Sequence, residues 1–540
     1  MAELKTDVKS AEELAKTQKG VSVSEFFEKN RHLLGYDNKI KALLIIVKEG
    51  VDNSLDACEE ARILPDIYVK MEEVSTEKYK IVIRDNGPGI IKQNIPKVFG
   101  SLLYGSKFHR LRQNRGAQGL GISCAVMYSQ LTTGEPVEVL SSTGDGKTHR
   151  YKMKIDVKNN VAQILEEETL TGKEWHGVQI TFVCEGIYRE HKQSVLEYIK
   201  QTAIANPFAN VVYEGPTGRF EFKRTINELP KEPKEIPPHI EGVEYGVFER
   251  MLRATTARSV ASFLTTEFSR LGKTTADEIC KVAGIDSKIS PRRVEDKDIG
   301  KLVQAAKQVK LIAPPTDVLS PLGDKLVEEG LKKELNPEFV ATVSRSPAVY
   351  RGFPFQVEVG IAYGQSITEF KIIRLANRVP LLYQQGDCAI TKSAMEVDWK
   401  RYKLQADKLP TEPMVLFVHI CSVWVPFTSE SKEAIASYPE IMKEIKLAMQ
   451  EAARKVSLYL SGIRKAEYMA ERRKTFEKYA EETAQALSEL TGDNAKKIKE
   501  LIEKVVAEKA GEFEDTGEEE ENGVDKKKKE KDEEEGGEEE

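Results

Sequence analysis

The stretch that most constrains the fold is an apolar run that begins at Ala42 and carries a polar face. Apolar side chains recur at three- and four-residue steps through 42–61, and this spacing predicts a helix. The same spacing places Glu49, Asn53 and Asp56 on one neighbouring face. Glu49 could act as a general base, with the Asn53 carbonyl oxygen as a ligand for Mg²⁺. On this stretch alone, an ordinary amphipathic helix with a solvated polar face is the favoured interpretation.

Composition indicates a soluble chain of several domains. Its 540 residues exceed what a single core supports, and 40% apolar with 31% charged residues is typical of soluble globular proteins. No run is long enough to span a membrane, and the N-terminus lacks an apolar signal core. The six cysteines are scattered without a C-x-x-C pair. This usage disfavours a metal cluster or a disulfide framework and favours a reducing, cytoplasmic location.

Charge is unevenly distributed along the chain. Residues 515–540 hold fourteen acidic residues and five lysines, a net charge of −9, whereas the whole chain carries −6. The remaining residues therefore sum to about +3, which permits nucleic-acid contact without arguing for it. The acidic end cannot bury a core, so we expect a disordered tail over 513–540.

Hydrophobic patterning in the first part of the chain predicts one sheet packed against helices. Alternation over Lys78–Arg84 predicts a strand that ends at Asp85. Residues 97–115 have few apolar anchors and indicate a mobile loop, after which Gly116–Gly121 enters a helix. Further strands are expected over Ile67–Met71, Pro136–Leu140, Arg150–Val157 and Val178–Cys184, with the helix over Ile122–Tyr128.

Proline-rich segments divide the second part of the chain. Leu229–Pro238 carries four prolines in ten residues and marks a linker, after which 240–310 is predicted to be helical and compact. Pro314-Pro315 marks another boundary, and the pattern from Lys432 to about Lys509 predicts one extended, charged helix. Strands of a second mixed domain are expected over 353–363, 370–384 and 414–427.

Two glycine-bearing motifs follow the first helix. Asp85-Asn-Gly-Pro-Gly-Ile is most simply a tight turn. Alternatively, Asp85 accepts the amino proton of adenine, while Gly87 and Gly89 let the base approach the backbone. Arg115-Gly-Ala-Gln-Gly-Leu-Gly-Ile-Ser is either a helix-entry loop or a site where a helix N-terminus binds phosphate. Its G-x-x-G-x-G spacing, without a directly preceding strand, disfavours a Rossmann motif.

In this order and spacing, the motifs E-x-x-x-N, D-x-G-x-G and G-x-x-G-x-G resemble those of the GHKL ATPases. That superfamily includes gyrase-type topoisomerases, heat-shock ninety chaperones, MutL mismatch-repair proteins and histidine kinases. From about Ser22 to residue 470 the chain resembles the B subunits of archaeal topoisomerase VI, a type IIB enzyme. The stretches that carry this resemblance are Lys48–Ala57, Leu103–Lys107, Gly119–Gly121, Leu271–Asp277, Ala376–Tyr383 and Asp398–Tyr402.

The resemblance implies an α+β multidomain fold. After a loosely ordered 1–20, a GHKL (Bergerat) α/β sandwich ATPase domain is expected over 21–229. Its N-terminal strap, around Phe26 and Phe27, would cross to a partner protomer. The remaining parts would be a small helix-two-turns-helix domain over 240–313, an α/β transducer domain (ribosomal S5 domain 2-like) over 316–470, and a C-terminal helical extension over 471–512.

The resemblance also implies roles for the residues of an ATP site. Glu49 would be the general base that polarises the attacking water, Asn53 would bind Mg²⁺, and Asp85 would read adenine. Lys432 would reach the γ-phosphate, although without the resemblance an ordinary lysine in the first turn of a helix is favoured. The residues expected to contact the nucleotide are Asn53, Asp85, Gly87, Gly89, Ser106, Lys107, Gly116, Ala117, Gln118, Gly119, Leu120, Gly121, Ile122, Ser123 and Lys432.

The chain departs from the family pattern at two positions. Ser123 stands where the family helix often carries a lysine, so one phosphate contact would be weaker. Gly177-Val178 replaces a common Gly-Thr, which removes a hydroxyl near the adenine. Neither departure touches Glu49 or Asn53, so the ATPase prediction stands.

Together these implications predict an ATP-operated gate. ATP and Mg²⁺ would bind each protomer, order the 97–115 loop and bring two chains together. Hydrolysis would be coupled to passage of one DNA duplex through a break in another, relaxing supercoils and decatenating. A separate A subunit would supply the cleaving tyrosine, in an assembly of two A with two B subunits. The alternatives are a GHKL chaperone or mismatch-repair ATPase, against which the helical 268–285 insert argues, and a nucleotide-gated DNA clamp without strand passage.

Overall fold

The computed structural model describes residues 11–105, 107, 110–116, 119–172, 174–429 and 431–505. The chain forms two compact units, which divide between Ser457 and Leu458. Three residues of the predicted site and the predicted acidic tail lie outside the described part of the chain. These residues are Ser106, Ala117 and Gln118.

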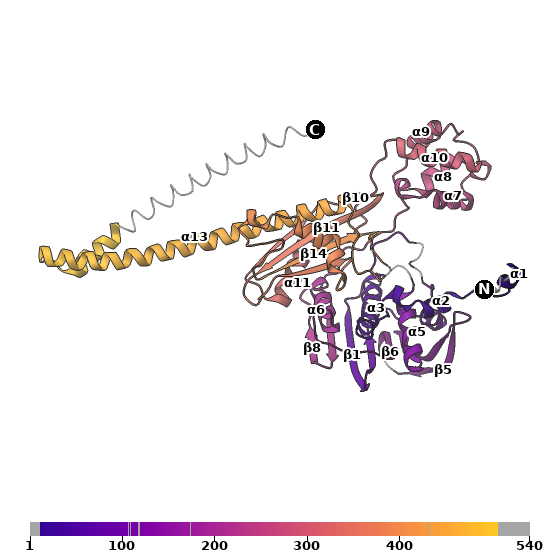
Figure 1. Ribbon diagram of the computed structural model, residues 1–540, viewed down its shortest axis with the longest axis horizontal. Helices are drawn as coiled ribbons and strands as arrows, with labels where there is room; N and C mark the ends of the chain where they lie inside the picture. Colours follow the sequence, from indigo (N-terminus) through magenta and orange to yellow (C-terminus); the bar gives the residue numbers. More distant parts are fainter. Residues whose placement is uncertain are drawn as a thin grey trace, which may run out of the picture. The chain divides into compact units, whose positions relative to one another are not determined.

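An eight-stranded sheet with helices packed against it forms the N-terminal part of the first unit (Figure 1). Its strands are β1 (Asp66–Ser75), β2 (Lys78–Arg84), β3 (Val137–Thr143), β4 (Lys147–Asp156), β5 (Val161–Thr171), β6 (His176–Glu185), β7 (Asn210–Gly215) and β8 (Gly218–Phe222). Their order is β5-β4-β3-β6-β2-β1-β7-β8, and all neighbours are antiparallel except β1 and β7. The helices of this part are α1 (Ala11–Ala15), α2 (Val23–Lys29), α3 (Lys39–Glu60), α4 (Ile95–Gly100), α5 (Gly121–Thr133) and α6 (Val195–Ala205).

Helix α3 occupies a central place because it contacts the sheet and both α5 and α6. It begins at Lys39, three residues before the predicted start, because the Asn38 side-chain oxygen accepts a hydrogen bond from the Ile40 N–H at 2.8 Å. The apolar positions expected from the periodicity are all buried in the core, and they are Leu44, Val47, Val51, Leu55 and Cys58.

The prediction of a mobile loop over 97–115 is wrong at both ends. Helix α4 extends into the segment, and the Phe99 ring is buried in the core. At the other end Gln113 and Arg115 are buried, and their side chains form polar contacts with Ser320 and Asp56. Hydrophobic patterning missed this second anchor because the side chains that hold it are polar.

A helical region with its own core follows the first sheet. Its aromatic centre consists of Phe248, Phe263 and Phe268, which contact one another with ring centroids 5.4 to 5.7 Å apart. The region therefore does not depend on either sheet for its core. Its helices are α7 (Tyr245–Ala254), α8 (Val260–Glu267), α9 (Lys273–Ala283) and α10 (Asp296–Gln308).

A six-stranded sheet completes the first unit. Its strands are β9 (Phe339–Ser344), β10 (Ala348–Tyr350), β11 (Phe353–Tyr363), β12 (Lys371–Ala376), β13 (Val379–Pro380) and β14 (Met414–Ser422). Their order is β10-β11-β14-β12-β13 with β9 on β11, and only β12 and β14 are parallel. Ile204 of α6 shares a core with Phe417 of this sheet, so the two sheets are joined through apolar contacts. Helices α11 (Asp324–Leu335) and α12 (Ala389–Met395) belong to this part.

The predicted single helix from Lys432 to Lys509 is wrong at its start and is interrupted. Helix α13 runs from Pro439 to Thr491, and a second helical stretch covers 495–505. Residues 432–438 instead lie in a loop, in which the Thr428 N–H donates to the Ala434 carbonyl at 2.9 Å. These tertiary hydrogen bonds override a helix-compatible local sequence.

The structure shows the state of the cysteines and the apolar character of the helices. All six cysteines are buried free thiols. Within the described ranges, no helix combines the length and apolar character needed to cross a membrane.

Candidate active site

A cavity of about 530 Å³ lies against α3 and the start of α5. It brings together Glu49 and Asn53 from α3, Asp85 directly after β2, and Lys432 from the loop before α13. These four residues come from three separate segments of the chain. The other predicted residues on the cavity wall are Gly89, Lys107, Gly116, Gly119, Leu120, Gly121 and Ile122.

Of the predicted residues that the structure describes, Gly87 and Ser123 do not line this cavity. The Gly87 N–H donates to Oδ1 of Asp85 at 2.9 Å. Ser123 is buried, and its hydroxyl donates to the carbonyl oxygens of Leu120 at 3.2 Å and Gly119 at 3.4 Å. Gly87 and Ser123 therefore do not line the cavity, but they form hydrogen bonds to residues that do.

Asp85 is the hydrogen-bond acceptor in the apolar part of the cavity. Its Oδ1 accepts from the backbone N–H groups of Gly87 and Val178, and its Oδ2 accepts from Ser54 Oγ at 2.8 Å. Burial raises the pKa of this carboxyl, and the three hydrogen bonds oppose that rise. A carboxylate has about four acceptor positions, so one remains open to a ligand. The apolar walls are formed by Ile45, Ile83, Ile90, Val98, Phe99, Val178 and Ile180.

Glu49 is held beside a lysine and a second carboxylate. Lys48 Nζ lies 3.3 Å from Glu49 Oε1 and 3.2 Å from Asp52 Oδ2, and the Tyr198 hydroxyl donates to Asp52 at 2.9 Å. Burial alone would raise the pKa of Glu49, but the charges of Lys48 and Lys432 outweigh it and the pKa is lowered. Glu49 is therefore ionised at neutral pH, as a general base must be.

The start of α5 meets Glu49 at a glycine. A Cβ atom on Gly121 would overlap Oε2 of Glu49, so glycine at this position leaves room for the carboxylate where it lies. A Cβ on Gly116 would lie 3.9 Å from Oδ1 of Asn53, which places the glycine loop beside the amide as well. The N–H groups of the first turn of α5 have no acceptor within the helix, so they can bind an anion next to the carboxylate and the amide.

Lys432 reaches the cavity from outside the first sheet. Its Nζ donates to the Arg115 carbonyl oxygen at 3.1 Å, directly before the glycine loop. Burial lowers the pKa of Lys432, and the nearby Glu49 opposes that effect. The neighbouring Glu433 forms an ion pair with Lys41 of α3, which fixes the lysine-bearing loop to the helix.

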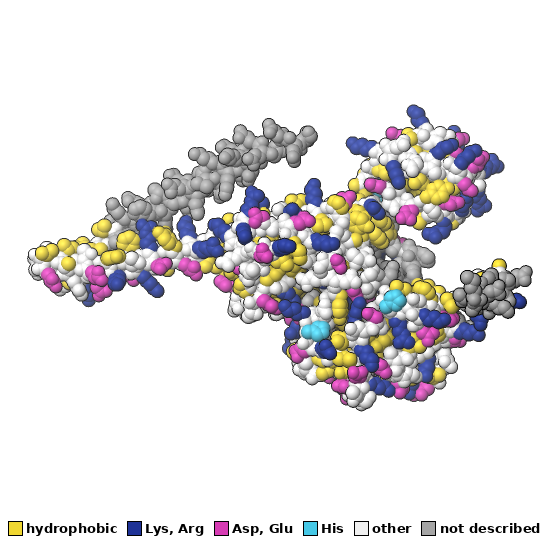
Figure 2. All heavy atoms as spheres, in the orientation of Figure 1, with side chains coloured by type: hydrophobic (Ala, Val, Ile, Leu, Met, Phe, Trp, Pro, Cys, Tyr) yellow, Lys and Arg dark blue, Asp and Glu magenta, His cyan; other side chains and the backbone are white. Residues whose placement is uncertain are grey.

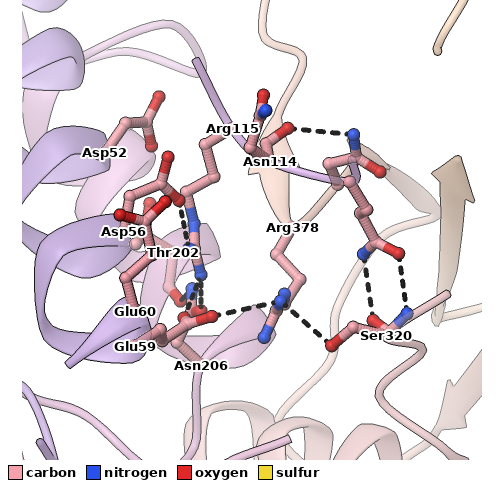
Figure 3. Close-up of polar contacts among 12 residues, drawn as sticks. Asp52, Asp56, Glu59, Glu60, Asn114, Arg115, Thr202, Asn206, Ser320 and Arg378 are labelled. Atoms are coloured by element: carbon pink, nitrogen blue, oxygen red, sulfur yellow. Dashed lines mark hydrogen bonds and ion pairs between the residues drawn. The ribbon is translucent and has the colours of Figure 1, made fainter. Parts of the chain in front are cut away.

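Asp56 anchors the polar segment before the glycine loop. It pairs with Lys107 Nζ at 2.6 Å. It also pairs with Arg115 Nη1 at 2.9 Å (Figure 3). Burial would raise the pKa of Asp56, but the two cations hold it well below its ordinary value. Asp56 thus lies on the predicted helix face, but its side chain holds the segment before the glycine loop and does not line the cavity.

Sequence reasoning missed the residues that support Glu49 and Asp85. Lys48 and Asp52 are four residues apart, and this spacing was an available signal for an ion pair on one helix. Ser54 and Tyr198 gave no comparable signal, because Ser54 is ordinary in a helix and Tyr198 is distant in sequence. Their contacts exist only after the chain has folded.

Two protein families match parts of the chain. The family described as "Histidine kinase-, DNA gyrase B-, and HSP90-like ATPase" matches residues 38–158. The family described as "Topoisomerase VI B subunit, transducer" matches residues 314–473, which include the six-stranded sheet and part of α13.

Curated relatives match most of the chain. Two of them, from Methanococcoides burtonii and Thermococcus gammatolerans, are both named as the B subunit of type 2 DNA topoisomerase 6. The relative from Methanococcoides burtonii is 49% identical over 459 residues, which cover 84% of this chain and 74% of that protein. The relative from Thermococcus gammatolerans is 42% identical over 541 residues, covering 91% and 96%. The predicted GHKL fold with a transducer is confirmed. By identity and coverage, the chain belongs to the family of type 2 DNA topoisomerase 6 B subunits.

Proposed function

We propose that the cavity beside α3 is the site where this GHKL ATPase binds and hydrolyses ATP. The observation that carries the proposal is the convergence of Glu49, Asn53, Asp85 and Lys432 on one cavity. An ionised base, an amide oxygen, a buried acceptor and a cation are the groups that ATP hydrolysis needs. They meet although Lys432 is hundreds of residues from Glu49 in the chain.

The adenine base fits the apolar part of the cavity. The open acceptor position on Asp85 takes one amino hydrogen of adenine, while apolar side chains such as Ile90 and Val178 contact the ring. Val178 supplies its backbone N–H to Asp85, so this interaction needs no hydroxyl at position 178. The polar groups at the start of α5 then lie where the phosphates extend.

Hydrolysis in this arrangement depends on positioning and charge neutralisation. Glu49 accepts a proton from the attacking water, and Lys48 and Lys432 keep its carboxylate ionised beforehand. Lys432 and the N–H groups at Gly121 and Ile122 stabilise the negative charge that develops on the phosphate.

Mg²⁺ fits the oxygen donors at this site. Asn53 is exposed and lines the cavity, where its carbonyl oxygen is a suitable ligand for a hard cation. In the described ranges, no group of three or more His, Cys, Asp or Glu side chains is arranged as a metal cage. This agrees with Mg²⁺, which commonly uses one or two protein ligands together with substrate phosphates. Bound Mg²⁺ would neutralise phosphate charge.

We propose further that the ATPase drives DNA strand passage with a separate cleaving A subunit, as two A with two B chains. The relatives' name, the B subunit of type 2 DNA topoisomerase 6, supports this assignment. Residues 240–313 carry thirteen Lys or Arg against ten Asp or Glu. Figure 2 shows Lys and Arg side chains over the visible face of α7–α10, a surface suited to DNA phosphates.

A relaxation assay on supercoiled DNA tests this function. The chain is incubated with ATP and Mg²⁺, with and without a cleaving subunit from a related species, and Glu49→Gln serves as the matched control. Relaxation that requires both subunits, ATP and Glu49 is expected. ATP turnover without relaxation, under conditions where the chain forms a complex with the cleaving subunit, would favour a nucleotide-gated clamp instead.

A further inference from the structure

The turn between β12 and β13 has an unusual backbone. Asn377 and Arg378 both have positive φ, 48° and 68°. Two consecutive residues of this kind form a two-residue hairpin turn that ordinarily carries Asn followed by Gly. Asn377 suits the first position, whereas Arg378 occupies the position where glycine would avoid strain.

Buried polar contacts hold this turn in place. The Arg378 N–H donates to His419 Nε2 at 3.0 Å, and His419 Nδ1 donates to Glu358 at 2.7 Å. Both His419 and Glu358 are fully buried. Asn377 exchanges two hydrogen bonds with Ser422, at 2.9 and 3.0 Å. The second sheet therefore fixes the direction in which the Arg378 side chain leaves the turn.

The Arg378 side chain crosses from the second sheet to α3. Its Nη2 lies 3.1 Å from Oε2 of Glu59 and 3.4 Å from Ser320 Oγ. Oε1 of the same Glu59 pairs with Arg115 Nη2 at 2.6 Å, so one carboxylate bridges two arginines (Figure 3). Arg115 directly precedes Gly116, and Glu59 lies on the helix that carries Glu49.

The backbone around Arg115 is tied to the second sheet by two further contacts. Gln113 and Ser320 exchange two hydrogen bonds, at 2.8 and 2.9 Å. Asn377 donates to the Asn114 carbonyl oxygen at 3.0 Å. Gln113 thus contacts Ser320 in the segment before α11, Asn114 contacts the β12–β13 turn, and Arg115 shares Glu59 with Arg378.

The pairing of Arg378 is incomplete. The side chain is 5% exposed, yet its Nε and Nη1 have no hydrogen-bond partner among the described residues. A buried cation with unmet donors is a poor way to stabilise a fold, because apolar side chains would do so at lower cost. An arginine in this strained turn is therefore better explained by the contact that it makes with Glu59 than by a contribution to stability.

We infer that Arg378 is a positioning residue that links the nucleotide site to the second sheet, acting through Glu59 and Arg115. The inference rests on the proposed function and adds a second connection to that made by Lys432. Lys432 contacts the cavity itself, whereas Arg378 acts on the segment that leads into the glycine loop. Nucleotide binding at Gly116–Gly121 would thereby change the environment of the β12–β13 turn.

Hydrogen–deuterium exchange with and without β,γ-imido-ATP and Mg²⁺ tests this link. In the wild-type chain we expect the nucleotide to protect both 113–121 and 371–383. Arg378→Met should keep protection of the first segment at saturating nucleotide but lose it over the second. Its affinity for the analogue should fall by roughly 5- to 150-fold, the range of typical coupling between linked sites. Arg378→Lys should restore part of both effects.

Matched variants separate coupling from loss of structure. Arg345→Met removes an arginine directly after β9, which pairs with Glu444 at 3.1 Å, and should leave both readouts unchanged. If Arg378→Met does not fold, Glu59→Gln and Glu59→Gln/Arg378→Met provide the test. The double variant removes both charges of the Arg378–Glu59 pair, and Arg115 keeps its ion pair with Asp56. Wild-type protection of 371–383 in all folded variants would overturn the inference. A wild-type chain that does not bind the analogue would refute the proposed function itself.

Discussion

At the scale of single residues, the ionisation of Glu49 is the property on which hydrolysis depends. Its burial disfavours the charged form, and Lys48 and Lys432 reverse that effect. The sequence predicted Glu49, Asn53 and Asp85 because these residues belong to short motifs. It did not predict Lys48, Asp52 or Tyr198 as supports, because their role depends on contacts formed in the folded chain.

Replacing Asn53 by Ala should weaken Mg²⁺-dependent nucleotide binding. The Asn53 amide oxygen is exposed beside the glycine loop and is the proposed ligand for Mg²⁺. Its loss should therefore reduce ATP affinity by about tenfold or more. Calorimetric titration with β,γ-imido-ATP in the presence of Mg²⁺ measures the change. The same titration without Mg²⁺ is the control, and there the variant should bind as the wild type does. Equal affinities with Mg²⁺ would contradict the assignment of Asn53 to the metal.

Replacing Asp56 by Asn should make the free energy of unfolding depend less on pH in the acidic range. The pKa of Asp56 is held below its ordinary value of 3.8 by Lys107 and Arg115 against the effect of burial. Its ionisation therefore stabilises the fold fully above pH 3.8, and this contribution is lost as pH falls towards the folded pKa. Urea unfolding from neutral pH downwards should show a smaller loss of stability in Asp56→Asn. An unchanged pH dependence would show that Asp56 does not contribute in this way.

At the scale of elements, the approach of α5 to α3 assembles the reactive part of the site. The periodicity of α3 predicted both its apolar face and the face that carries Glu49. By contrast, the loop that carries Lys432 was predicted as helix, because its hydrogen bonds to Thr428 and Pro426 are not visible in local sequence. The 97–115 segment was misjudged for the same reason, since buried polar contacts anchor Arg115.

Replacing Gly121 by Ala should reduce ATP turnover while the fold is retained. Alanine suits a helix, but its Cβ would overlap the Glu49 carboxylate and displace that carboxylate from its position in the cavity. A displacement of this kind can cost about 100-fold in rate. Steady-state turnover measures the effect, and Gly462→Ala is the control because a Cβ there meets no atom within 4 Å. Full turnover in Gly121→Ala would contradict the described contact.

At the scale of the whole molecule, the site is complete only when the two sheets of the first unit come together. Glu49, Asn53 and Asp85 belong to the first sheet and its helices, whereas Lys432 follows the last strand of the second. Motif spacing and resemblance were sufficient to predict the family and the GHKL fold, which are confirmed. The domain limits stay a prediction, as do the partner protomer and the separate cleaving chain. Such assemblies depend on surfaces that motifs do not describe.

The most direct test of the central claim is ATP turnover by Glu49→Gln beside the wild-type chain, with β,γ-imido-ATP binding measured on both. Glutamine keeps the size of the side chain but cannot accept a proton from water at neutral pH. The account predicts that the variant binds the analogue with near wild-type affinity and loses turnover by about 100-fold or more, the contribution of a general base. Wild-type turnover in Glu49→Gln would contradict the assignment of Glu49 as the base.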